Sequence, residues 1–111
     1  DIREAPALVL IDDLLKAGAT ARAHDPEAMD HVRAQFGDRI SLHTNPMEAL
    51  DGADGLAIMT EWSEFRTPDF AEMATRLKRR VIFDGRNLYD LETMQEAGFD
   101  YFSIGRPPIR N

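Results

Sequence analysis

The chain has 111 residues, of which 43% are hydrophobic and 30% charged, and it carries a net charge of −7 at pH 7. This composition is typical of one soluble globular domain, and the negative charge argues against nucleic acid as a partner. The absence of cysteine excludes disulfides, thiolate chemistry and cysteine-ligated zinc, and it agrees with a cytoplasmic location. No apolar run approaches the roughly 18 residues of a membrane span, so we expect no membrane partner.

The first half of the chain predicts alternating helices and short strands. Leu8, Ile11 and Leu15 recur at helical spacing, Pro6 suits a first helical turn and Gly18 ends the pattern, which predicts a helix over 6–17. The next expected elements are a strand at 20–24, a helix at 26–36 closed by Gly37, a strand at 40–43, and a short helix opened by Asn45-Pro46 and ended by Gly52.

The second half continues the alternation. Residues 55–60 are apolar at both alternating sets of positions, which predicts a strand buried on both faces and therefore central in its sheet. We expect a helix opened by Pro68 and Asp69, with Phe70, Met73, Ala74 and Leu77 facing inward. Then follow a strand at 81–84, a helix from about Tyr89 that Gly98 ends, and a strand at 99–104, after which Gly105-Arg106-Pro107-Pro108 is expected to end the ordered structure.

Alternating strands and helices predict an α/β fold, a three-layer α/β/α Rossmann-like parallel sheet. The chain nevertheless opens on a helix, and a crossover helix joins two parallel strands. We therefore expect residues 1–111 to be a fragment of a larger protein that lacks the first, interior strand of its sheet. The alternative is a domain that begins with a helix.

Arg86 is the strongest candidate for a binding residue. The apolar run Val81-Ile82-Phe83 reads as a buried strand that Asp84-Gly85 breaks, so Arg86 should follow the carboxyl end of that strand. Ligands of open α/β sheets bind outside the carboxyl ends of the strands, and a guanidinium suits phosphate or carboxylate. The alternative is that Arg86 pairs with Asp84 or Asp90 and braces the turn.

The other strand ends offer weaker candidates. Asp25 could meet a ribose hydroxyl, although Pro26 beside it favours a helix N-cap. Glu61 has no acidic or basic partner at a fixed spacing, and Trp62 is interpreted as a loop anchor rather than a base-stacking residue. The sequence has no G-x-G-x-x-G, no Walker loop, no catalytic triad and no metal-ligand spacing among its three histidines. It predicts a binding domain with no catalytic residue and no metal site of its own.

Four motifs in register resemble one family. They are the opening Asp1-Ile2-Arg3-Glu4, the Thr60-Glu61-Trp62 triplet, the run Phe83-Asp84-Gly85-Arg86-Asn87, and the ending Tyr101-Phe102-Ser103-Ile104-Gly105-Arg106. Over the whole chain, this order and spacing is similar to the C-terminal UDP-binding domain of the UDP-glucose/GDP-mannose dehydrogenase family.

The resemblance implies an enzyme that oxidises the C6 alcohol of a UDP-hexose to a carboxylate with two NAD⁺, working as a homodimer or higher homo-oligomer. Arg86 then corresponds to an arginine that contacts the UDP-sugar, and Arg3 to one that reaches the NAD side of the cleft. Glu61 and Trp62 would be structural or cleft-lining, and the resemblance assigns no role to Tyr101 or Arg106. The family's catalytic cysteine, its NAD-binding domain and a strand with a substrate-contacting lysine are not in this sequence, so NAD would be bound mainly outside the chain.

Two alternatives accompany this interpretation. A relative acting on UDP-N-acetylhexosamines or GDP-mannose would have the same fold, but the Thr60-Glu61-Trp62 and Phe83–Asn87 strings favour the UDP-glucose branch. A non-catalytic, receiver-like interaction module would need clustered acidic residues and a late lysine at the strand ends. Asp84-Gly85-Arg86 does not supply that set.

Overall fold

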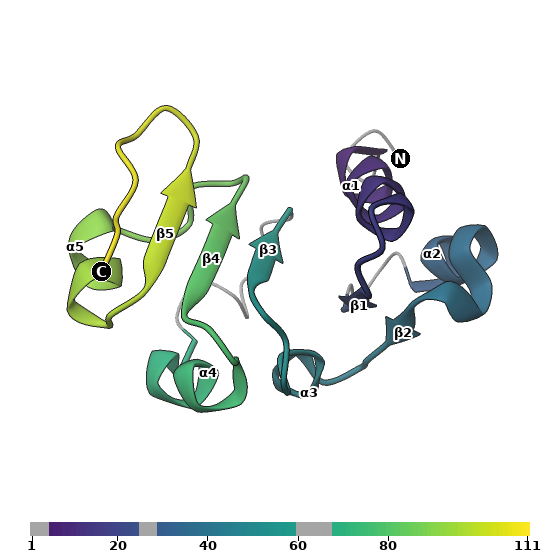
Figure 1. The fold of residues 1–111 in the computed structure, drawn as a ribbon, viewed down its shortest axis with the longest axis horizontal. Coiled ribbons are helices and arrows are strands. Elements are labelled where there is room, and N and C mark those ends of the chain that lie inside the picture. The colour runs from purple at the N-terminus through teal and green to yellow at the C-terminus, as the bar shows by residue number, and fades with distance from the viewer. Residues whose placement is uncertain (1–4, 25–28, 60–67) are drawn as a thin grey trace. The chain divides into compact units, whose positions relative to one another are not determined.

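The computed structural model describes residues 5–24, 29–59 and 68–111, and these form two compact units (Figure 1). Unit 1 comprises residues 1–49 and unit 2 residues 50–111. Arg3, Asp25, Glu61 and Trp62 lie outside the described residues.

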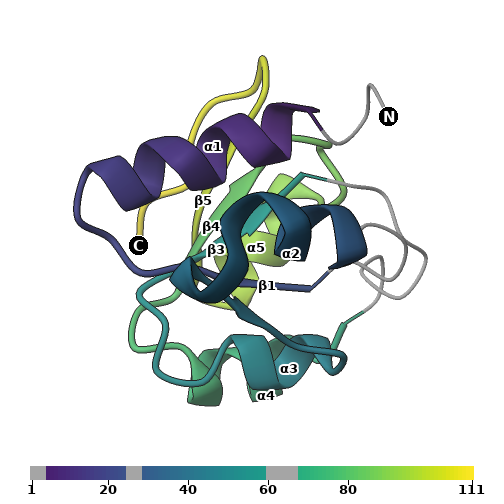
Figure 2. The same ribbon diagram turned by 90° about the vertical axis from the view of Figure 1, so that its right-hand side faces the viewer.

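Unit 1 is built around one small apolar core. Its elements in chain order are α1 (Ala5–Lys16), β1 (Arg22–Ala23), α2 (Met29–Phe36), the 3₁₀ helix η1 (Gly37–Arg39), β2 (Ser41–Leu42) and α3 (Pro46–Ala49). The strands β1 and β2 pair in parallel. Val32, Phe36 and Ile40 are buried, and partly buried apolar side chains from α1 and both strands pack against them. Figure 2 brings α1 and α2 of this unit to the front.

The helix ends of unit 1 follow from local hydrogen bonding. Gly18 has φ +90°, and the amides of Gly18 and Ala19 donate to the carbonyls of Leu15 and Leu14, so α1 ends as predicted in a glycine C-cap. Helix α2 ends at Phe36 as predicted, where Gly37 has φ +56°, and the chain then adds the 3₁₀ turn η1, which the sequence did not predict. Arg39 explains this, because its guanidinium donates to the carbonyl of Phe36 at 3.3 Å and lies 5.3 Å from the centre of the Phe36 ring.

Unit 2 contains a three-stranded parallel sheet in the order β3-β4-β5. Its elements are β3 (Leu56–Ile58), α4 (Phe70–Arg76), β4 (Val81–Asp84), α5 (Leu91–Glu96) and β5 (Asp100–Ser103). The three arrows of this sheet point the same way in Figure 1. Both sheets are parallel and their strands alternate with helices, as predicted for a Rossmann-like α/β fold.

The expectation that β3 is a central strand is wrong for the sheet described here. In the described residues β3 pairs with β4 alone, whereas β4 pairs with β3 on one side and β5 on the other. Ala57 in the middle of β3 is exposed, while Ile82 of β4 is completely buried. The apolar pattern of 55–60 was therefore a poor guide to sheet position, because small or apolar side chains also occur on an uncovered face.

Helix α4 forms as the sequence predicts. The side chain of Asp69 accepts a hydrogen bond from the amide of Glu72 at 3.0 Å and caps the helix. Met73 and Leu77 are buried, as expected. Phe70 contacts Tyr89 and Phe99 edge-on, with ring centres 5.1 and 6.1 Å apart, so the amino end of α4 packs on the aromatic side chains of unit 2.

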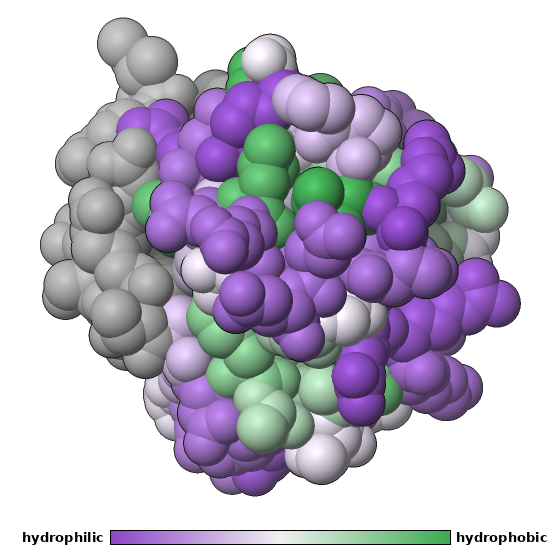
Figure 3. Space-filling model, turned by 90° about the vertical axis from the view of Figure 1, so that its left-hand side faces the viewer, coloured by the Kyte–Doolittle hydropathy of each residue, from purple (hydrophilic) through white to green (hydrophobic). Residues whose placement is uncertain are grey.

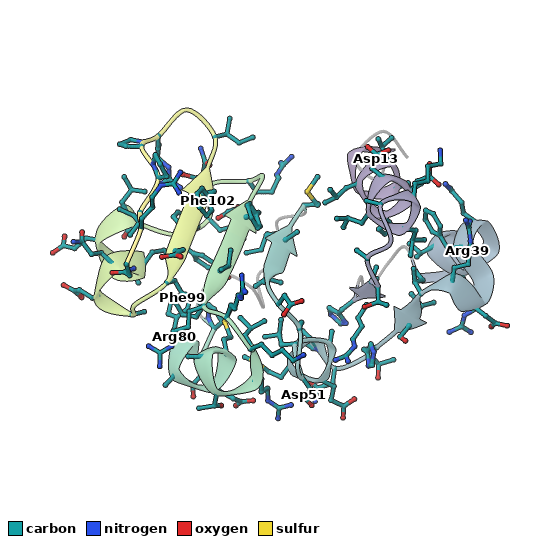
Figure 4. All side chains as sticks on the ribbon, viewed as in Figure 1. Asp13, Arg39, Asp51, Arg80, Phe99 and Phe102 are labelled. Carbon is teal, nitrogen blue, oxygen red and sulfur yellow. The ribbon has the colours of Figure 1, made fainter. Side chains whose placement is uncertain are left out.

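The last residues of the chain correct a second expectation. The segment after Pro108 returns beside β5, where Ile109 and Tyr101 exchange two backbone hydrogen bonds. Asn111 donates to the carbonyl of Phe99, and Arg110 lies over the ring of Phe102 (Figure 4 labels Phe99, just before β5, and Phe102 on β5). The prolines prevent a helix but leave the segment free to pair with the open edge of β5.

Among the described residues, no helix combines the length and the apolar character needed to cross a bilayer. The predicted absence of a first strand concerns residues outside this chain and stays a prediction.

Candidate functional site

Two loops leave unit 2 at the carboxyl end of its sheet. We call residues 84–89 the Arg86 turn, which follows β4, and residues 104–109 the tail loop, which follows β5. Figure 1 shows both at the end to which the strand arrows point. The predicted binding residue Arg86 and the two unassigned residues Tyr101 and Arg106 all belong to this end of unit 2.

Asp84 holds the Arg86 turn in shape. Its side chain is only 2% exposed, and its two oxygens accept hydrogen bonds from the amide of Arg86 at 2.8 Å and the amide of Leu88 at 2.7 Å. The hydroxyl of Tyr101 donates a third, at 2.6 Å. A buried carboxylate costs free energy unless such donors compensate for lost water, so this arrangement fixes the turn and the carboxylate together.

Both tyrosines of the chain belong to this network. Burial, then the hydrogen bond to Asp84 and the charge of that carboxylate, raise the pKa of Tyr101 to about 12. Burial, and after it the charge of Asp84, raises the pKa of Tyr89 well above its ordinary value. A phenol is protonated at neutral pH, as the Tyr101 hydroxyl must be to donate to Asp84, and the raised pKa values extend this state to more alkaline pH.

Arg106 ties the tail loop to the same network. Its guanidinium donates to the Tyr101 hydroxyl at 2.9 Å, the Tyr89 carbonyl at 3.0 Å and the Ser103 hydroxyl at 3.0 Å. It also lies 5.5 Å from the centre of the Tyr101 ring. The Tyr89 carbonyl also lies 3.2 Å from the oxygen of the Tyr101 hydroxyl, whose one proton is donated to Asp84. Because these bonds use Tyr89, helix α5 begins at Leu91, two residues later than predicted, with Asp90 as its N-cap.

Gly85 and Asn87 complete the path of the turn. The Gly85 amide donates to the Ile58 carbonyl of β3 at 2.8 Å, and a Cβ at Gly85 would come within 3.2 Å of that oxygen, so a side chain would crowd this approach. Asn87 adopts a left-handed conformation with φ 54°. Its side-chain amide exchanges two hydrogen bonds of 2.8 Å with the backbone of Ile104.

Arg86 itself is exposed, and it lies between two anchored neighbours. The sequence left open whether Arg86 pairs with Asp84 and braces the turn. In the structure the main-chain amide of Arg86 donates to the Asp84 side chain and braces the turn in this way. An exposed guanidinium on a fixed turn at the carboxyl end of a parallel sheet can bind a phosphate or carboxylate with two parallel hydrogen bonds. The molecular face that carries α5 is mainly hydrophilic, with small separate hydrophobic areas (Figure 3).

The described residues offer no group of three or more histidine, aspartate or glutamate side chains that could hold a metal ion. Arg3, the residue predicted to reach NAD, and the candidates Asp25, Glu61 and Trp62 lie outside those residues, so their predicted roles are not tested here. The described part of the chain brings together Arg86, Tyr101 and Arg106 in one region.

Sequence reasoning named Asp84 only as a possible partner of Arg86, and it missed Asn87 and Tyr89 as supporting residues. A signal for them exists, because three contacts between the Arg86 turn and the tail join residues 17 positions apart: Asp84 with Tyr101, Asn87 with Ile104, and Tyr89 with Arg106. This constant offset can be read only once the register of β4 and β5 is known, in which Tyr101 lies beside Ile82, two residues before Asp84.

Comparison with known proteins finds similarity to nucleotide-sugar dehydrogenases. A model described as the UDP-binding domain of the UDP-glucose/GDP-mannose dehydrogenase family matches residues 1–91. The UDP-glucose 6-dehydrogenase of Pseudomonas aeruginosa is 46% identical over 112 aligned residues, which cover 96% of this chain and 25% of that protein. UDP-glucose 6-dehydrogenase TuaD of Bacillus subtilis is 42% identical, in an alignment that covers 99% of this chain and 24% of that protein.

A solved structure supports the fold. The UDP-D-ManNAc dehydrogenase of Pyrococcus horikoshii superposes with a TM-score of 0.54 at 18% identity, over 94% of this chain and 31% of that one. The chain spans about a quarter of the length of the curated relatives it matches.

Proposed function

The chain belongs to the UDP-glucose/GDP-mannose dehydrogenase family, and we propose that residues 1–111 are the UDP-sugar-binding C-terminal domain of an NAD-dependent UDP-glucose 6-dehydrogenase. The observation that supports this most directly is Arg86, exposed on a turn that Asp84 fixes at the carboxyl end of the sheet. Its guanidinium binds the diphosphate or ribose side of the UDP-sugar through charge-assisted hydrogen bonds.

We propose that the reaction itself takes place on residues outside this chain. The sequence has no cysteine and no G-x-G-x-x-G. NAD, which accepts the hydride, is therefore bound mainly elsewhere, with Arg3 reaching its side of the cleft. The full enzyme works in the cytoplasm as a homodimer or higher homo-oligomer, with a UDP-sugar and neither nucleic acid nor membrane as its partner.

The direct test is calorimetric titration of the 111-residue chain with UDP, beside a circular dichroism melt that shows whether the chain is folded. Arg86→Ala should weaken UDP binding by about 1.5–3 kcal/mol, because it removes a hydrogen-bonding charge. Arg79→Ala is the matched control, since Arg79 is also exposed in unit 2 but lies next to the end of α4. It should bind UDP as the unchanged chain does.

Three results would contradict the proposal or part of it. Equal UDP affinity in the unchanged and Arg86→Ala chains removes Arg86 from the site. A folded chain that ignores UDP moves the site to segments outside residues 1–111. In the enzyme that carries this domain, Arg86→Ala should raise the KM for UDP-glucose, and turnover of UDP-N-acetylhexosamines or GDP-mannose in preference to UDP-glucose would correct the substrate.

A further inference from the structure

Asn87 connects the residue beside Arg86 to the tail loop. Its side-chain nitrogen Nδ2 donates to the Ile104 carbonyl at 2.8 Å, and its Oδ1 accepts from the Ile104 amide at 2.8 Å. One side chain thus satisfies both backbone groups of a residue 17 positions away. Such a paired contact fixes orientation as well as distance, because two parallel hydrogen bonds cannot both form after a rotation.

The conformation of Asn87 makes it suited to this position. Its φ of 54° lies in the left-handed region, which asparagine and glycine adopt far more readily than other residues. The Asp84 side chain holds the amide of Arg86 through a hydrogen bond. Asn87, the residue after Arg86, is itself held by its hydrogen bonds to Ile104. The backbone of Arg86 is therefore held from both neighbours.

Apolar packing does not explain this connection. Ile104 is 64% exposed, so its side chain contributes little burial that could hold the two loops together here. The Asn87–Ile104 pair is also exposed, and a bond in water contributes modestly to stability. Its larger effect should be on the direction of the Arg86 side chain, because a group held in its binding geometry loses less freedom when the ligand arrives.

We propose that Asn87 is a positioning residue, which through its contact with Ile104 sets the Arg86 guanidinium for the phosphate groups of the nucleotide. The proposal rests on the function proposed above, in which Arg86 binds UDP. It extends the site to the tail loop, whose residues touch no ligand in this scheme.

The test is a set of variants titrated with UDP well below their melting temperatures. Asn87→Gly keeps the left-handed backbone and removes both hydrogen bonds, so it should weaken UDP binding about tenfold. Asn111→Gly is the matched control. The side chain of Asn111 also donates to a backbone carbonyl, that of Phe99, but Phe99 lies at the other end of β5.

A double-mutant cycle separates positioning from general stability. If Asn87 acts through Arg86, Asn87→Gly should change UDP affinity little in a chain that already carries Arg86→Ala. Asn111→Gly should lower the melting temperature without changing UDP affinity. Unchanged UDP affinity in Asn87→Gly overturns the positioning role while Arg86→Ala still supports the proposed function. A tenfold loss that persists in the Arg86→Ala background also overturns it. If the unchanged chain does not bind UDP, or Arg86→Ala binds it equally well, both proposals fail.

Discussion

The two parallel strand pairs β4–β5 and β1–β2 end in different ways. At the carboxyl end of β4 and β5, the side chains of Asp84, Tyr101 and Arg106 form a buried network that binds the backbone of the next loop. At the same end of β1 and β2, the Nδ1 atom of His24 donates to the His43 carbonyl at 2.8 Å. The Nε2 atom of His43 is buried and has no hydrogen-bond partner among the described residues.

This difference shows what a parallel sheet leaves undetermined. Ladder hydrogen bonds fix the register of the strands, but they end where the strands end and do not fix the loops. Unit 2 adds side chains that satisfy the loop backbone, and its Arg86 turn is consequently specified residue by residue. Unit 1 has two-residue strands and a core of three buried side chains, so its strand ends depend on fewer contacts. A site that needs fixed geometry is better supported by the ends of β4 and β5.

The largest expected effect comes from Asp84→Ala. Without the carboxylate, two amides and the Tyr101 hydroxyl lose their acceptor, and unsatisfied buried donors cost about 1–3 kcal/mol each. We expect a loss of about 4 kcal/mol in the free energy of unfolding, measured by urea, and faster hydrogen exchange at the amides of Arg86 and Leu88.

Asp90→Asn is the control for that experiment. Asp90 is an exposed N-cap whose side chain makes no capping hydrogen bond, so its change should stay within about 0.5 kcal/mol. If Asp84→Ala proves as stable as Asp90→Asn, the side-chain network at the ends of β4 and β5 does not add to the free energy of unfolding.

Alkaline pH should act on unit 2 next most strongly. Both states hold the Tyr101 proton below pH 10. Between an unfolded pKa near 10 and a folded pKa of about 12, the unfolded chain releases that proton first, so stability falls as the pH rises. The chain has two tyrosines and both are buried, so tyrosinate absorbance should not rise near pH 10 while the chain is folded.

Tyr101→Phe sharpens the alkaline experiment. This variant removes one of the two raised phenols, so the decline of stability above pH 10 should become shallower, with Tyr89 accounting for what remains. Tyrosinate absorbance that rises with an ordinary tyrosine pKa in the folded chain would show that the phenols are accessible to solvent. A buried network would then no longer distinguish the ends of β4 and β5 from those of β1 and β2.

The sequence predicted those parts of the molecule that depend on neighbouring residues. The end of α1 at Gly18, the Asp69 cap of α4 and the strand at 81–84 each follow from a few adjacent side chains, and the structure confirms them. Arg86 was predicted for the same reason, because a broken apolar strand marks the residue that follows it. The family was also recognisable, since its motifs are short strings in a fixed order.

Contacts over long sequence distances escaped prediction. The three pairs 17 residues apart depend on how β5 is placed beside β4, and no local pattern states that placement. The return of Ile109 to β5 was missed because Gly105 and the prolines mark a loop without showing where it leads. The edge position of β3 was missed because burial of a strand is decided by what covers it, not by its own residues.

The smallest expected effect belongs to the ends of β1 and β2. His24→Ala removes the hydrogen bond to the His43 carbonyl, a single partly buried contact, and should cost about 1 kcal/mol in the free energy of unfolding. Thr44→Ala, an exposed neighbour in the following loop, should be within about 0.5 kcal/mol of the unchanged chain. If His24→Ala instead destabilises the chain as much as Asp84→Ala, one imidazole would fix the loops of unit 1 as firmly as the whole network fixes those of unit 2. The strand ends of unit 1 would then be as well prepared to hold a ligand as the Arg86 turn, and the choice of site would have to come from charge alone.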